Sequence, residues 1–171
     1  MGWYAEAGKG SVYAVRSDGS VERLLSGLTI PNSLAFSVDG KRMFHTDSPT
    51  KMLRYSDTKH PSTTDPVLHD LRSEEFVSDG TTADSEDHLW TCHWDGGEIV
   101  RISPEGTVVS RIAVPTGRPT RACLGGADLR TLFVTTAIGD LADEPNDDAG
   151  AGRLYTTRVP VPGTHEPTFG F

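Results

Sequence analysis

Asn32 and Asp79 are the two residues of this 171-residue sequence whose types and positions suit metal chemistry. Asn32 lies in the segment IPNS and Asp79 in the segment FVSDG. An amide oxygen and a carboxylate are hard donors of the kind that Ca²⁺ and Mg²⁺ prefer. Asn and Asp are also common in turns, where their side chains bond their own backbone. The residue types alone therefore leave two interpretations open, a metal site or two turns.

Three segments of the same design determine where these residues lie. They are NSLAFSVDGKRMFHTD from residue 32, DGTTADSEDHLWTCHW from residue 79 and RACLGGADLRTLFVTT from residue 121. In each, a short strand-like run meets a polar turn and continues into an alternating apolar run, the pattern of a β-hairpin. The spacing of the three starts is that of propeller blades. Because equivalent residues of successive blades point toward one central axis, we expect Asn32 and Asp79 to converge there.

Further hairpins lie between these units. One spans residues 11–25 around Asp18-Gly19, and another spans residues 98–114 around Glu105-Gly106. In such turns the Gly takes the position with positive φ. No long stretch shows the apolar spacing of an amphipathic helix. The sequence therefore predicts an all-β chain built from four-stranded sheets, with a β-propeller as the architecture.

The composition excludes several classes of function. The chain has 16 basic and 24 acidic residues, a net charge of −8 that repels phosphate backbones, so we expect no nucleic-acid partner. No run approaches the ~20 apolar residues of a membrane helix, and no signal-peptide pattern is visible, so we expect a cytoplasmic protein without a membrane contact. Cys92 and Cys123 are interpreted as reduced, buried thiols, although two cysteines can form one disulfide. His88 and His93 are interpreted as structural or exposed.

The stretch from about residue 10 to residue 137 resembles the later part of the SMP-30/gluconolactonase family, which includes the regucalcins. The resemblance is carried, in this order, by GSVYAVRSDGSV, GLTIPNSLAFSVDGKRMFHTDS, VSDGTTADSEDHLWTCHWDGGEIVRISPEG and RPTRACLGGADLRTLFVTTA, and by the C-terminal GRLYTTRVPVPGTHEPTFGF. It implies a six-bladed propeller that binds one divalent metal on its axis and hydrolyses sugar-type lactones. We therefore expect an incomplete six-bladed propeller of about three to four blades. Residues 1–171 would form a single partial domain that lacks the family's N-terminal blades.

Carried over residue by residue, the resemblance makes Asn32 and Asp79 metal ligands. It also makes Asp79 the catalytic base for the attacking water. The metal would be Ca²⁺ or Zn²⁺, with Mg²⁺ and Mn²⁺ as further candidates, and the partner a small-molecule lactone. The substrate-binding residues stay unknown. A divalent cation suits this reaction because it polarises a carbonyl group and acidifies water.

The sequence also departs from the family's pattern. Ser33 stands where the family usually has Gly, and Ser78 where it usually has Pro, which could displace the backbone that carries each ligand. The family's Glu ligand and its substrate-binding Arg and Asn have no counterpart, and Glu6 and Glu22 are poor substitutes. Hydrolysis could therefore be impaired. The alternative is a non-catalytic propeller fragment, a weak calcium binder or half of an assembled propeller, and its bare blade edges would favour self-association.

Overall fold

The computed structural model describes residues 6–138, 148–166 and 168 of the chain. Regular structure in this part consists of one short 3₁₀ helix, η1 (Ser48–Thr50), and thirteen strands. The strands are β1 (Gly10–Val15), β2 (Val21–Leu28), β3 (Pro31–Phe36), β4 (Arg42–Asp47), β5 (Met52–Asp57), β6 (Val67–Asp70), β7 (Val77–Ala83), β8 (Leu89–Trp94), β9 (Glu98–Ile102), β10 (Val108–Ala113), β11 (Pro119–Gly125), β12 (Thr131–Thr136) and β13 (Leu154–Arg158). Among the described residues, no helix is long and apolar enough to cross a membrane.

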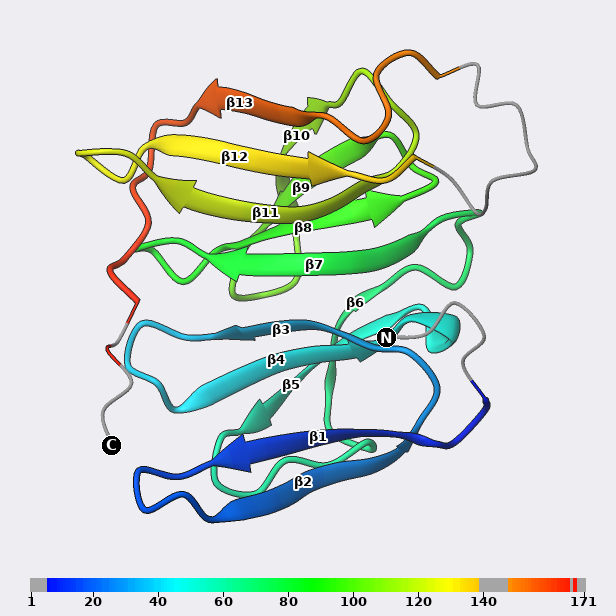
Figure 1. The fold of residues 1–171 in the computed structure, drawn as a ribbon, viewed down its shortest axis with the longest axis vertical. Coiled ribbons are helices and arrows are strands. Elements are labelled where there is room, and N and C mark those ends of the chain that lie inside the picture. The colour runs from blue at the N-terminus through cyan, green and yellow to red at the C-terminus, as the bar shows by residue number, and fades with distance from the viewer. Residues whose placement is uncertain (1–5, 139–147, 167, 169–171) are drawn as a thin grey trace.

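The strands form four antiparallel sheets, each made from strands that follow one another in the chain. Their orders are β1-β2, β3-β4-β5-β6, β7-β8-β9-β10 and β11-β12-β13. Figure 1 shows the sheets stacked in chain order, from β1 and β2 at the bottom to β11–β13 at the top. Two complete four-stranded blades thus lie between a two-stranded and a three-stranded sheet, and the described sheets do not close into a ring. The prediction of an all-β, incomplete propeller is confirmed.

Three layers of apolar side chains hold the four sheets together. The layer between the first two sheets contains Leu25, Leu28 and Met43. The layer between the two four-stranded sheets contains Ala35, Phe44, Leu53, Leu89, Val100 and Ile102. The layer below the last sheet contains Trp90, Cys92, Ile99, Ala122, Leu124, Leu132, Val134 and Val159. Because side chains alternate along a strand, the sheet of β7–β10 contributes apolar side chains to both neighbouring layers and is apolar on both faces.

The two cysteines are both free thiols, but only one of them is buried. Cys92 on β8 lies in the core, as predicted. Cys123 on β11 is exposed, so the prediction of a buried thiol at this position is wrong. Strand alternation gives the reason, because Ala122 and Leu124 point into the core and Cys123 must point to the opposite face. In the described part of the chain, no further sheet covers that face.

Candidate functional site

Asn32 and Asp79 meet where the two four-stranded blades adjoin. Asn32 lies on β3 and Asp79 on β7, the first strands of their blades, and these strands pack side by side (Figure 1). Nδ2 of Asn32 donates a hydrogen bond of 2.5 Å to Oδ1 of Asp79, and both residues are half-buried. Two side chains 47 residues apart in the sequence therefore converge as the repeat predicts.

A β-bulge in each strand places these two residues. The register of β3 with β4 shifts between Asn32 and Ala35. The register of β7 with β8 shifts between Ser78 and Thr81, the interval that contains Asp79. A bulge interrupts the ladder and redirects the local side chains. Both candidate residues thus lie at points where their strands leave regular pairing.

Two serines link the blades around this pair. Oγ of Ser33 donates a hydrogen bond of 2.5 Å to the backbone oxygen of Asp79. Oγ of Ser48 donates a bond of 3.0 Å to the backbone oxygen of Ser78, and Nδ2 of Asn32 lies 3.4 Å from the same hydroxyl. In the described strands no backbone ladder joins adjacent blades, so these hydroxyl groups hold the β7 backbone in place beside Asn32.

Ser33 adopts a left-handed backbone conformation, with φ at 55°. For an L-residue this conformation costs roughly 1–2 kcal/mol, whereas Gly adopts it freely. The bond from its hydroxyl group to Asp79 offsets part of this strain. The Ser at this position therefore leaves Asn32 within hydrogen-bonding distance of Asp79. Ser78, the second departure, is buried, and its hydroxyl group has no partner among the described residues.

Burial raises the pKa of Asp79 from 3.8 to about 6. The hydrogen bond from Asn32 and the charge of Arg121 both lower this pKa, but they only partly offset the loss of hydration. Burial and the nearby Asp79 carboxylate also raise the pKa of the Cys92 thiol. Cys92 is therefore a neutral thiol and not a nucleophile, since the thiolate is the reactive form.

The donor atoms of this site are of the type that a hard divalent cation prefers. The site offers one carboxylate and one amide, and a rotation of the Asn32 amide group would turn its oxygen to the side now occupied by Nδ2. A poorly hydrated carboxylate also gains from a nearby positive charge. Among the described residues, however, no group of three or more His, Cys, Asp or Glu gathers around a common point. Asn32 and Asp79 would thus supply two of the ligands, and water could supply others.

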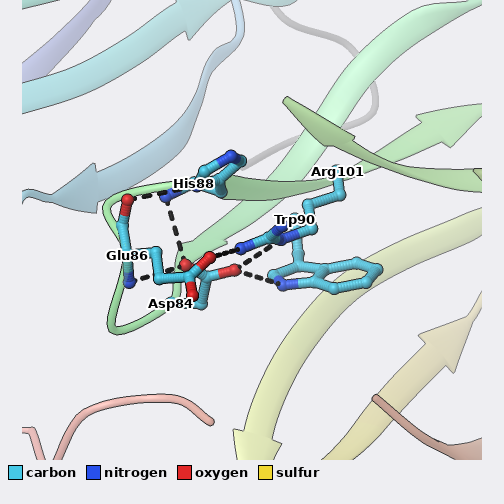
Figure 2. A network of polar contacts seen from close by, with 5 residues as sticks. All are labelled: Asp84, Glu86, His88, Trp90 and Arg101. Carbon is cyan, nitrogen blue, oxygen red and sulfur yellow. Dashed lines mark hydrogen bonds and ion pairs between the residues drawn. The ribbon is translucent and has the colours of Figure 1, made fainter. Parts of the chain in front are cut away.

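Asp84 is a second buried carboxylate, and both of its oxygens accept hydrogen bonds from surrounding donors. One oxygen accepts hydrogen bonds from Nε1 of Trp90 over 3.1 Å and from Nε of Arg101 over 2.7 Å. The other accepts the backbone N–H groups of Glu86 and His88 (Figure 2). This network closes the turn between β7 and β8, so Asp84 is structural. The sequence analysis did not identify it, although an Asp at the start of the DSEDH turn is a signal for such a bond.

His93 is also structural, as expected. Its side chain is buried, Nδ1 lies 3.0 Å from Oε1 of Glu98, and its ring stacks on that of Phe76 at 4.6 Å. His88 bonds the backbone oxygen of Glu86 through Nδ1. Neither ring contributes to the site formed by Asn32 and Asp79.

Known proteins share this sequence pattern. Residues 1–138 match the family described as SMP-30/Gluconolactonase/LRE-like region. A 6-deoxy-6-sulfogluconolactonase from Pseudomonas putida is 34% identical over 164 residues, which cover 94% of this chain and 56% of the relative. A pentonolactonase from Haloferax volcanii is 34% identical over 169 residues, which cover 94% of this chain and 57% of the relative.

The fold is also shared with a solved structure. The crystal structure of regucalcin, a calcium-binding protein from Agrobacterium tumefaciens, superposes with a TM-score of 0.88 at 30% identity and covers 100% of this chain and 59% of that one. The chain thus spans less than three fifths of the length of these relatives. Because the family match extends over most of the sequence and the regucalcin fold accommodates the whole chain, the chain belongs to the SMP-30/gluconolactonase/LRE-like family.

Proposed function

We propose that this chain carries the metal-binding and base-bearing part of a lactonase that opens a sugar-type lactone with water. The observation that carries the proposal is the 2.5 Å approach of Asn32 to Asp79 from two different blades. The names of two relatives, a sulfogluconolactonase and a pentonolactonase, support the substrate class.

Asn32 and Asp79 would hold the cation through an amide oxygen and a carboxylate oxygen. The bound cation would supply Lewis acidity toward the lactone carbonyl and lower the pKa of water. Oxygen-only donors favour Ca²⁺ first, with Zn²⁺, Mg²⁺ and Mn²⁺ as further candidates. The calcium-binding regucalcin supports a divalent cation of this kind.

Asp79 would act as the general base. In the cation-free chain a pKa of about 6 still leaves this carboxylate mostly ionised at neutral pH, so it can accept a proton. Asp79 takes a proton from water while the water oxygen bonds to the lactone carbonyl carbon. The ring C–O bond then breaks, the ring oxygen receives the proton, and the product is an open-chain hydroxy acid.

Lactone hydrolysis by the chelator-treated chain tests this proposal. We expect acid release from aldonolactones to require added Ca²⁺ or Zn²⁺ and to fall by about 10²-fold or more in Asp79→Asn and in Asn32→Ala. Glu105→Gln, which removes one exposed carboxylate from the β9–β10 turn, is the matched control and should keep full activity. Full activity in Asp79→Asn, or no cation-dependent hydrolysis by the unaltered chain, would overturn the proposal.

A second candidate function is that of a non-catalytic half that completes its propeller with another polypeptide. The observation that favours it is the exposure of large apolar side chains on the two end sheets. Tyr13, Val15 and Val21 of β1 and β2 are 56%, 53% and 63% exposed, and Leu154 of β13 is 62% exposed. Defined oligomers of a chain that opens no lactone would favour this function over the first.

A further inference from the structure

Arg121 heads the third repeat unit, at the position that Asn32 and Asp79 hold in the first two. It lies on β11, and the register of β11 with β12 shifts between Pro119 and Arg121. The third blade therefore has a register shift directly before its first repeat residue, near the place where the other two blades have theirs. β11 packs along β7, on the side away from β3 (Figure 1). The three equivalent residues thus lie on three adjacent strands, each with a register shift beside the residue concerned.

The side chain of Arg121 lies against β7 at Gly80, the residue after Asp79. Gly80, the next residue along β7, makes room for it, because a Cβ atom there would lie 2.5 Å from Cδ of Arg121 and 2.6 Å from the backbone oxygen of Thr120. The aliphatic part of Arg121 therefore covers Gly80. Its positive charge is also close enough to lower the pKa of both the Asp79 carboxyl and the Cys92 thiol.

The guanidinium group of Arg121 has no partner within the described part of the chain. Arg121 is exposed, and its side chain makes no hydrogen bond or ion pair with any residue that the structure describes. On the same sheet, by contrast, Arg158 pairs with Asp128. An unpaired guanidinium group presents a rigid, permanently charged fork that binds carboxylate, phosphate or sulfonate oxygens through two hydrogen bonds.

We propose that Arg121 determines substrate specificity by favouring lactones that carry an anionic substituent at a distance from the ring carbonyl. The proposal rests on the proposed function, because it places the carbonyl of such a lactone beside Asn32 and Asp79. The net charge of −8 repels anions at long range, so an anionic substrate needs a local cation of this kind. A carboxylate, a phosphate and a sulfonate share the required chemistry, and the choice of probes separates the first two.

Binding of open-chain sugar acids to the 171-residue chain tests the proposal without turnover. The probes are D-gluconate, D-glucarate, which has a second carboxylate, and 6-phospho-D-gluconate, titrated calorimetrically at low salt with the same concentration of Ca²⁺. We expect one or both of the probes with a second anionic group to bind about tenfold more tightly than D-gluconate. Arg121→Gln should abolish this preference, and Arg121→Lys should retain part of it. Arg158→Gln is the matched control, since it removes one exposed charge at the far end of the same sheet.

The outcomes separate this proposal from the proposed function. Equal affinity for all three probes, or a preference that survives Arg121→Gln, overturns the role of Arg121. Equal weakening of all three probes by Arg121→Gln assigns it a structural role and also overturns the proposal. If the chain opens neutral lactones without preferring charged ones, the proposed function stands and the role of Arg121 fails. If it binds the probes with a second anionic group through Arg121 but opens no lactone, only the proposed function fails.

Discussion

Replacement of Asp79 by Asn should stabilise the chain at neutral pH. In the folded state burial raises the pKa of this carboxyl from 3.8 to about 6. The unfolded state loses the proton as pH rises through about 4, and the folded state loses it only near pH 6. The free energy of unfolding therefore falls over this window as pH rises, by about 3 kcal/mol. Asn has the same shape, has no charge to bury, and can still accept the hydrogen bond from Asn32.

Thermal unfolding followed by circular dichroism measures this effect, with chelator present and at several pH values. At pH 7.5 we expect the Tm of Asp79→Asn to exceed that of the unaltered chain by roughly 6–12 °C, and the difference to vanish below about pH 4. Comparison at each pH cancels the contributions of all other titrating groups. Glu105→Gln, with the same change of charge at an exposed turn, should leave Tm within about 2 °C. A Tm lower than that of the unaltered chain at pH 7.5 would refute the inference that Asp79 is poorly hydrated.

Added cations should remove most of this difference. A cation that binds only the folded state stabilises it by about 2.7 kcal/mol at one hundred times its Kd. Millimolar Ca²⁺ or Zn²⁺ should therefore raise the Tm of the unaltered chain and leave that of Asp79→Asn unchanged. An equal rise in both proteins would show that the cation binds elsewhere, and the assignment of Asp79 as a ligand would fail.

Three further predictions follow from the packing around the site and at the end sheets. Ser33→Gly should be more stable than Ser33→Ala by about 1 kcal/mol in urea unfolding, because both lose the bond to Asp79 but only Gly relieves the positive φ; equal stabilities would contradict the strain. Asp84→Ala should lose about 3–5 kcal/mol, since it leaves Arg101 without its buried partner, while Glu86→Gln at the exposed end of the network should lose less than about 1 kcal/mol. Light scattering at micromolar concentration should show oligomers held by the exposed apolar end sheets, and a clean monomer would contradict this expectation.

The hairpins of the fold could be predicted from the sequence because each one carries its own local signal. Alternating apolar runs around Asp-Gly or Glu-Gly pairs mark β1–β2 and β9–β10, and the repeat marks β3–β4, β7–β8 and β11–β12. The strand β6 has only four residues, Val67–Asp70, and follows a stretch rich in Ser, Thr and Pro, so its pairing depends on β5 and leaves no clear periodicity. Exposure of Cys123 also escaped prediction, because it depends on which sheets lie beside β11.

The candidate site could be predicted only as far as its positions in the repeat. Asn32 and Asp79 are equivalent in the sequence, and the structure brings them together. The bulges that place them leave no signature in residue type, since they appear only as a shift in strand register. Arg121 is the first residue of the third repeat segment, equivalent to Asn32 and Asp79. Its proximity to Asp79 nevertheless depends on the close packing of β11 over Gly80, which a periodicity argument does not contain.

The contrast between the two buried carboxylates argues for where the function lies. Each oxygen of Asp84 accepts two hydrogen bonds, so this carboxylate is buried with its hydrogen bonds satisfied and has a structural role. Asp79 has a raised pKa, and Ser33 beside it holds a strained φ. Local features that lower stability persist where the surrounding structure enforces them, and they concentrate at functional sites. A cation beside Asp79 would supply the positive charge that its partly desolvated carboxylate lacks, so the burial of this carboxylate is a destabilising feature that cation binding would relieve.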